Sequence, residues 1–164
     1  MNLDAISQGL ADELHKLAHD QPPLPLKDND PAGEGGVRDM FLELLVLSLA
    51  NLYSKMPLGS SLFDRAMVKA VTSHLPDNEV GKLVVKAEDW IRQENLVKVQ
   101  EGQKNYSLSL QALAALCTET ADGGTLGTLM EKAKSAYVRQ LQSKQLRRST
   151  RRLASAFLGI MAKG

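Results

Sequence analysis

Hydrophobic residues recur with helical spacing through most of this chain. Near the start, Leu3, Ile6, Leu10, Leu14 and Leu17 follow one another at intervals of three or four residues, which places them on one face of a helix. Residues 20–36 interrupt the pattern with four prolines and three glycines. Proline removes a backbone donor and glycine loosens the chain. We therefore expect an N-terminal helix over residues 1–19 and an irregular linker over residues 20–36.

The next stretch predicts three successive helices. Residues 37–55 are apolar on nearly every side, which is typical of a buried helix. Ser60 or Ser61 is expected to cap a second helix that ends near residue 74. Residues 79–94 carry a continuous apolar stripe that includes Val80, Leu83, Val84, Ala87, Trp90 and Ile91. This third helix is amphipathic, so one of its faces is expected to meet solvent.

A short hairpin is expected after the third helix. Residues 96–99 and 105–108 predict two strands joined by the turn at 101–104. Ser109 is placed to cap a further apolar helix. Together with the three helices, this hairpin defines an expected domain over residues 37–122.

The C-terminal segment, residues 125–164, carries two apolar stripes with a basic run between them. The second stripe includes Leu153, Phe157 and Ile160, and the arginines of the run fall largely opposite to it. This predicts a strongly amphipathic basic helix. Residues 125–164 are expected to form one helix or two, with Ser149–Thr150 as a weak point.

The pattern W-I-x-x-E-N-L-V … Y-S-L-S-x-x-A-L-x-x-L, which begins at Trp90, resembles the winged helix-turn-helix superfamily over residues 38–117. The resemblance implies that Trp90 and Ile91 end a recognition-type helix inside the core, that Leu96 begins the wing, and that Tyr106 and Leu108 return it. The expected fold class is therefore mainly α: a winged helix-turn-helix core with a small two-stranded β-wing, plus N-terminal and C-terminal amphipathic helices.

Charge is distributed unevenly, although the net charge is only +1. Residues 1–36 hold seven acidic residues and two lysines, whereas residues 125–164 hold nine basic residues against Glu131. An acidic start and a basic end suggest that the C-terminal segment meets something anionic. A single cysteine and the absence of a long apolar run favour a cytoplasmic protein without a transmembrane segment.

The resemblance suggests a regulatory role in which the protein binds double-stranded DNA or a partner that is itself bound to DNA. The candidate contacts are the cations of the third helix, of the wing and of the basic run: Lys82, Lys86, Arg92, Lys98, Lys104, Lys144, Arg147, Arg148, Arg151 and Arg152. Affinity for duplex DNA depends largely on neutralising phosphates. Acidic residues offset the cations of the third helix, namely Glu79, Glu88, Asp89 and Glu94, so its own charge does not favour DNA.

The alternative is a protein-interaction scaffold. In that interpretation the basic C-terminal helix docks on a partner protein, on a second copy of the chain or on an anionic membrane through residues 144–161. In the DNA-binding interpretation we expect a homodimer formed through the N-terminal and C-terminal helices. A positive face shared by the third helix and the arginine cluster would favour nucleic acid, and opposite faces would favour the scaffold.

No grouping of acid, base and nucleophile supports an enzyme, and neither a cofactor nor a metal is expected. His15 and His19 lie one helical turn apart without a recognisable third ligand. Cys117 follows an apolar run and is expected to be a buried small hydrophobe.

Overall fold

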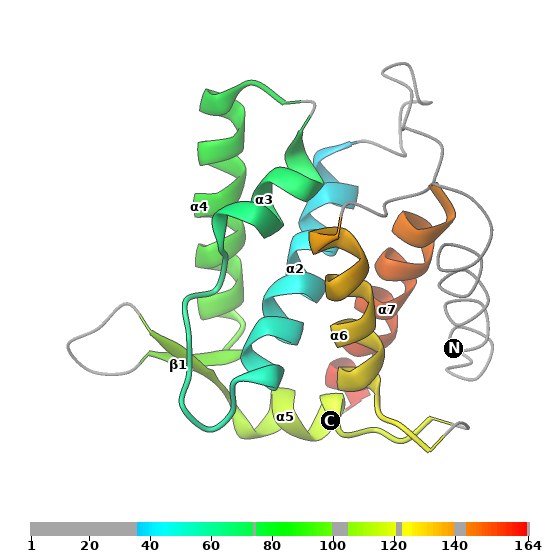
Figure 1. Cartoon of the computed structure of the whole chain (residues 1–164). Coiled ribbons are helices and arrows are strands. Elements are labelled where there is room, and N and C mark those ends of the chain that lie inside the picture. The colour runs from blue at the N-terminus through cyan, green and yellow to red at the C-terminus, as the bar shows by residue number, and fades with distance from the viewer. Residues whose placement is uncertain (1–35, 74, 100–104, 121–122, 140–143, 164) are drawn as a thin grey trace.

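The computed structural model describes residues 36–73, 75–99, 105–120, 123–139 and 144–163 (Figure 1). The expected helix over residues 1–19, the linker up to residue 35 and the wing turn at 101–104 lie outside these ranges. Within them the chain is mainly helical with a small two-stranded sheet, as the sequence predicts. The elements in chain order are α2 (Val37–Ser54), α3 (Arg65–Thr72), α4 (Asp77–Gln93), β1 (Val97–Val99), β2 (Tyr106–Leu108), α5 (Leu110–Leu116), α6 (Leu126–Val138) and α7 (Lys144–Lys163).

Helix α2 is the centre of the molecule. Every residue from Glu43 to Leu52 is buried, which confirms the expectation from its apolar sequence. Helices α3, α4, α6 and α7 all pack against it. In Figure 1 α2 lies between α4 on one side and α6 with α7 on the other. The long apolar helix therefore serves as a shared core for elements that are distant in sequence.

The connection between α2 and α3 differs from the expectation. Ser60 and Ser61 do not cap α3; Asp64 does, by accepting a 2.7 Å hydrogen bond from the Met67 N–H. Ser60 instead pairs with Tyr106 through backbone N–H···O bonds of 2.9 and 2.7 Å. The amide of Asn51 holds this segment by donating to Ser60 Oγ and to the Ser61 carbonyl. The serines were misassigned because their contacts are with residues far from them in sequence.

The hairpin and the next helix agree with the sequence. Strands β1 and β2 are antiparallel, with Val97 opposite Leu108 and Val99 opposite Tyr106. Ser109 caps α5 and accepts a 3.2 Å hydrogen bond from the Ala112 N–H. Local signals decide both features, since a hydroxyl cap needs only the N–H groups of the following turn.

The C-terminal segment forms two helices, but the break is not at Ser149–Thr150. The first helix, α6, ends at Val138, and both of the suspected residues lie inside α7. The Thr150 hydroxyl donates 2.8 Å back to the Leu146 carbonyl, which satisfies it without interrupting the helix. Side chains of both helices, including Tyr137 and Phe157, belong to the same hydrophobic core as α2.

Close packing of α6 on α2 depends on Gly127. A Cβ atom at this position would lie 2.5 Å from Cε1 of the Tyr53 ring, whose hydroxyl is 3.1 Å from Thr125 Oγ1. Gly127→Ala is therefore expected to lower the free energy of unfolding by about 1–3 kcal/mol, because overpacking outweighs the gain in helix propensity. Gly159→Ala in α7, where a Cβ meets nothing within 4 Å, is the control and should stabilise by up to about 1 kcal/mol. Chemical denaturation measures both, and equal stabilisation by the two substitutions would contradict the close approach.

Candidate functional site

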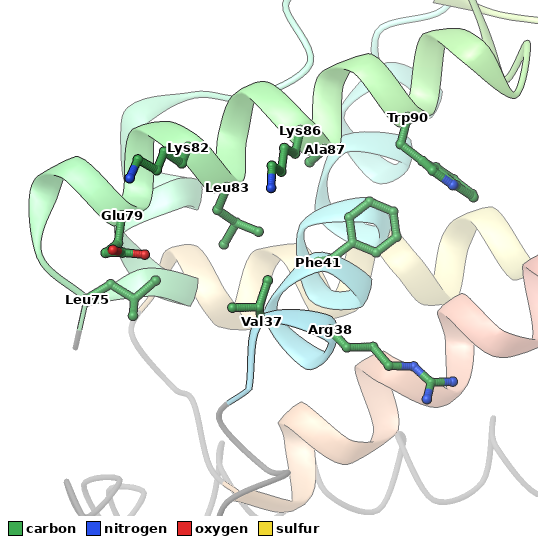
Figure 2. A pocket seen from close by; sticks show the side chains of 10 residues that line it. All are labelled: Val37, Arg38, Phe41, Leu75, Glu79, Lys82, Leu83, Lys86, Ala87 and Trp90. Atoms are coloured by element: carbon green, nitrogen blue, oxygen red, sulfur yellow. The ribbon is translucent and has the colours of Figure 1, made fainter.

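An open groove of about 490 Å³ runs between the first turns of α2 and one side of α4 (Figure 2). Its apolar wall is formed by Val37, Phe41, Leu75, Leu83, Ala87 and Trp90. The polar residues that line it are Arg38, Glu79, Lys82 and Lys86. The lining residues of α4 recur every three or four positions from Glu79 to Trp90, so about three turns of this helix line the groove. The groove therefore combines an apolar wall with an excess of positive charge.

Two aromatic rings lie in the apolar wall of the groove. Phe41 and Trp90 meet edge to face, with ring centroids 5.1 Å apart and planes at 83°. Both side chains are only partly buried, although they pack against the core. Such rings offer a large, rigid apolar surface at little cost in conformational entropy when a partner binds.

The two lysines on the α4 side of the groove, Lys82 and Lys86, are among the residues that the sequence suggests as contacts with nucleic acid. Lys82 and Lys86 are exposed and lie one helical turn apart, and Figure 2 shows them along the α4 side of the groove with Arg38 on the α2 side. Glu79 is the one acidic residue among the groove's lining residues. The two lysines thus border an apolar surface, which the sequence alone did not indicate.

The other candidate cations of α4 and the wing are not among the residues that line the groove. Arg92 is exposed on α4, and Lys98 is exposed on β1; Lys104 lies outside the described residues. On the wing side of α4, Glu88 accepts a short hydrogen bond from the Tyr106 hydroxyl. Burial and the neighbouring Glu88 raise the pKa of Tyr106. This acidic residue is therefore used to join the hairpin to α4.

The basic run of α7 divides into buried and exposed residues, and this corrects the expectation that all five of its cations are candidate contacts with nucleic acid. Arg147 is only 5% exposed. Its Nε lies 2.6 Å from Glu43 Oε1, and its Nη2 donates 3.0 Å to the Val71 carbonyl. Arg147 is therefore withdrawn as a phosphate contact, because reaching a phosphate would require breaking this buried ion pair.

Arg151 is also engaged by α2. Its Nη1 lies 2.6 Å from Asp39 Oδ2, and both side chains are largely buried. By contrast, Lys144, Arg148 and Arg152 are exposed. Only these three residues of the run remain on the surface as candidate contacts with an anionic partner.

Glu43 is the centre of a buried polar cluster that sequence analysis missed. It accepts hydrogen bonds from Arg147 and, at 2.5 Å, from the Tyr137 hydroxyl. Burial raises the pKa of Glu43 even though Arg147 opposes the shift, and burial next to Glu43 raises the pKa of Tyr137. The available signal was a single charged residue, Glu43, in the mostly apolar sequence 40–52. The cluster joins α2, α3, α6 and α7, which is a structural role.

The apolar face of α7 is occupied by the protein itself. Leu153 and Phe157 are fully buried in the core, so they are not presented to a lipid surface as the membrane interpretation requires. No described helix is both long and apolar enough to cross a bilayer. In Figure 1 α4 and α7 lie on opposite sides of α2, so the lysines of α4 and the basic run of α7 come from helices that α2 separates.

The described residues include one free cysteine but no group of side chains that could hold a metal ion. They contain no group of three or more histidine, cysteine or acidic side chains placed to hold a metal ion, and the three histidines of the sequence lie outside them. Cys117 is exposed at the end of α5, so the expectation of a buried residue is wrong. The helix stops at Leu116, which leaves Cys117 beyond the buried face.

Comparison with known proteins adds no family: no family model, curated protein or solved structure matches this chain.

Proposed function

We propose that the protein is a non-enzymatic interaction module that binds an acidic amphipathic helix in the groove between α2 and α4. The observation that carries the proposal is an open apolar groove, walled by Phe41 and Trp90, with Lys82 and Lys86 along one side. Amphipathic helices commonly dock by laying their apolar face into such a groove. The lysines would then meet acidic residues that flank the apolar face of the ligand.

A winged-helix scaffold is part of this proposal. The order α2, α3, α4, β1, β2, α5 agrees with the three helices, two-stranded wing and following helix that the sequence resemblance implies. Fold does not fix function, so the same scaffold is compatible with a DNA or a protein ligand.

The surface of α4 favours the protein ligand. Val85 is 57% exposed there, and the helix carries three cations against Asp77, Glu79, Glu88 and Asp89. Duplex DNA is held mainly through its phosphates, which have no apolar face to cover the wall formed by Phe41 and Trp90. A partner helix would place its apolar face on the aromatic rings and the acidic residues beside that face near the lysines.

The test uses a designed peptide with leucines at i, i+4 and i+7 and glutamates beside them, titrated into the full-length protein. Trp90 is the only tryptophan in the sequence, so its fluorescence reports directly on the groove. We expect the peptide to shift the Trp90 emission, and K82E/K86E to weaken binding roughly five- to tenfold through loss of two exposed charge pairs.

The control variant is K69E/K132E, which makes the same change in net charge at exposed lysines of α3 and α6. A scrambled peptide of equal composition controls for charge alone. Equal weakening by both variants, or equal binding of the scrambled peptide, would contradict a specific site.

DNA binding is the outcome that would redirect the proposal. The measurement is binding of mixed-sequence duplex DNA at low and at raised salt. If the protein binds the duplex at low salt, if the affinity falls steeply as salt is raised, and if K82E/K86E abolishes binding, then the exposed lysines contact DNA phosphates and not a partner helix.

A further inference from the structure

We infer that the chain's own acidic N-terminal segment, residues 3–17, occupies the groove between α2 and α4 and must be displaced by a partner helix. This inference rests on the proposed function, since it names a competitor for the same groove.

The N-terminal segment is tethered at the groove itself. Val37, which lines the groove, is the first residue of α2, and Gly36 is its N-terminal cap. The linker 20–36 can extend to roughly 55–60 Å. The part of α4 that lines the groove, from Glu79 to Trp90, is only about 16 Å long. A segment that precedes this linker therefore reaches the whole groove in either direction.

The apolar spacing of the segment suits the groove. Lining residues of α4 recur over three turns, which accommodates a docked helix that presents side chains at i, i+4 and i+7. Leu10, Leu14 and Leu17 have this spacing. Their stripe needs an apolar surface, and the partly buried rings of Phe41 and Trp90 provide one.

Opposite charges favour the same contact. The groove is lined by three cations and Glu79, whereas residues 3–17 carry three acidic residues and one lysine, and the linker 20–36 adds four acidic residues and one lysine. The basic side chains deepest in α7 do not compete for these acids, because Arg147 and Arg151 are paired with Glu43 and Asp39.

Tethering makes even a weak contact effective. A short flexible linker gives an effective concentration on the order of 1 mM. A segment with an intrinsic Kd of about 10–100 µM would then cover the groove in most molecules. The apparent affinity for a free peptide would fall by about 10- to 100-fold, because only the uncovered fraction can bind it.

The experiment uses the full-length chain and the variant L10Q/L14Q, which removes two residues of the apolar stripe. Acrylamide quenching of Trp90 should increase in the variant, and the designed acidic peptide should bind it about 10- to 100-fold more tightly than wild type. The control A5Q/H15Q introduces glutamines outside the Leu and Ile stripe and should behave as wild type. Circular dichroism and thermal unfolding establish that all three proteins are folded.

The outcomes separate the two proposals. Unchanged quenching together with equal peptide affinity in wild type and L10Q/L14Q would overturn the N-terminal contact while leaving the groove as a binding site. No peptide binding to either protein would overturn the proposed function as well. Shielding of Trp90 that disappears on dilution would overturn the intramolecular contact in favour of exchange between two copies.

Discussion

Arg147→Ala is expected to lower the free energy of unfolding by about 3–5 kcal/mol, because it leaves the buried carboxylate of Glu43 without its charged partner. The Glu43 side chain is fully buried, and Arg147 forms an ion pair with it at 2.6 Å. The substitution also removes the donor to the Val71 carbonyl. Urea denaturation followed by circular dichroism measures the loss.

Two variants make this result interpretable. Arg148→Ala, at the exposed neighbouring position, should change stability by less than about 0.5 kcal/mol. The double variant E43M/R147M should recover much of the loss, since apolar replacement of a whole buried ion pair is often close to neutral. If Arg147→Ala and Arg148→Ala are equally mild, the ion pair does not hold α7 to α2.

The loss caused by Arg147→Ala should also depend on pH. Arg147 lowers the pKa of Glu43, whereas burial raises it. Removing the arginine therefore raises the folded-state pKa further above the unfolded value. A group with a raised folded pKa favours folding at low pH, and this contribution disappears as pH rises through the folded pKa. The stability deficit of the variant should thus be smaller in acid than at neutral pH, where the buried carboxylate is charged.

Phe157→Ala is expected to have a similarly large effect, about 3–5 kcal/mol, through loss of apolar burial and creation of a cavity. Phe157 is fully buried on α7 and belongs to the core that surrounds α2. A helix that docked only on an external partner would lose little intrinsic stability on this change. The midpoint of chemical denaturation measures the difference.

Leu110→Ala is the matched control, since it truncates a large apolar residue that is 74% exposed. It should shift stability by no more than about 0.5 kcal/mol. A Phe157→Ala protein as stable as this control would mean that α7 separates from the core in solution, and would restore the interpretation of α7 as a free docking helix.

Local sequence signals predicted much of the fold. The apolar run of α2, the hairpin and the Ser109 cap are all found in the structure. The hairpin and the cap depend on residues within a few positions of one another, and α2 depends on burial of its apolar residues. Local contacts and apolar stripes can both be recognised from the spacing of residues along the sequence. Where the cap of α3 was misassigned, Ser60 was instead held by Asn51 and by the backbone of Tyr106.

The candidate site depended on distant contacts, so the sequence predicted only part of it. Lys82 and Lys86 were expected on an exposed face, and they are exposed. The apolar wall beside them comes partly from Phe41, on a helix about forty residues earlier in the chain. Helical periodicity shows that a face is apolar, but it does not show whether a neighbour covers that face fully or leaves a groove.

The amphipathic pattern of the helices and the separation of an acidic start from a basic end are properties of residue order, so they can be read without any structure. The tertiary structure decided how that charge is used. It buried Arg147 against Glu43, a residue 104 positions away, and it left Lys82 and Lys86 beside a groove. The physical reason is that the cost of burying a charge depends on whether an opposite charge is brought to it, and only the packing of α2, α4 and α7 brings those groups together or keeps them apart.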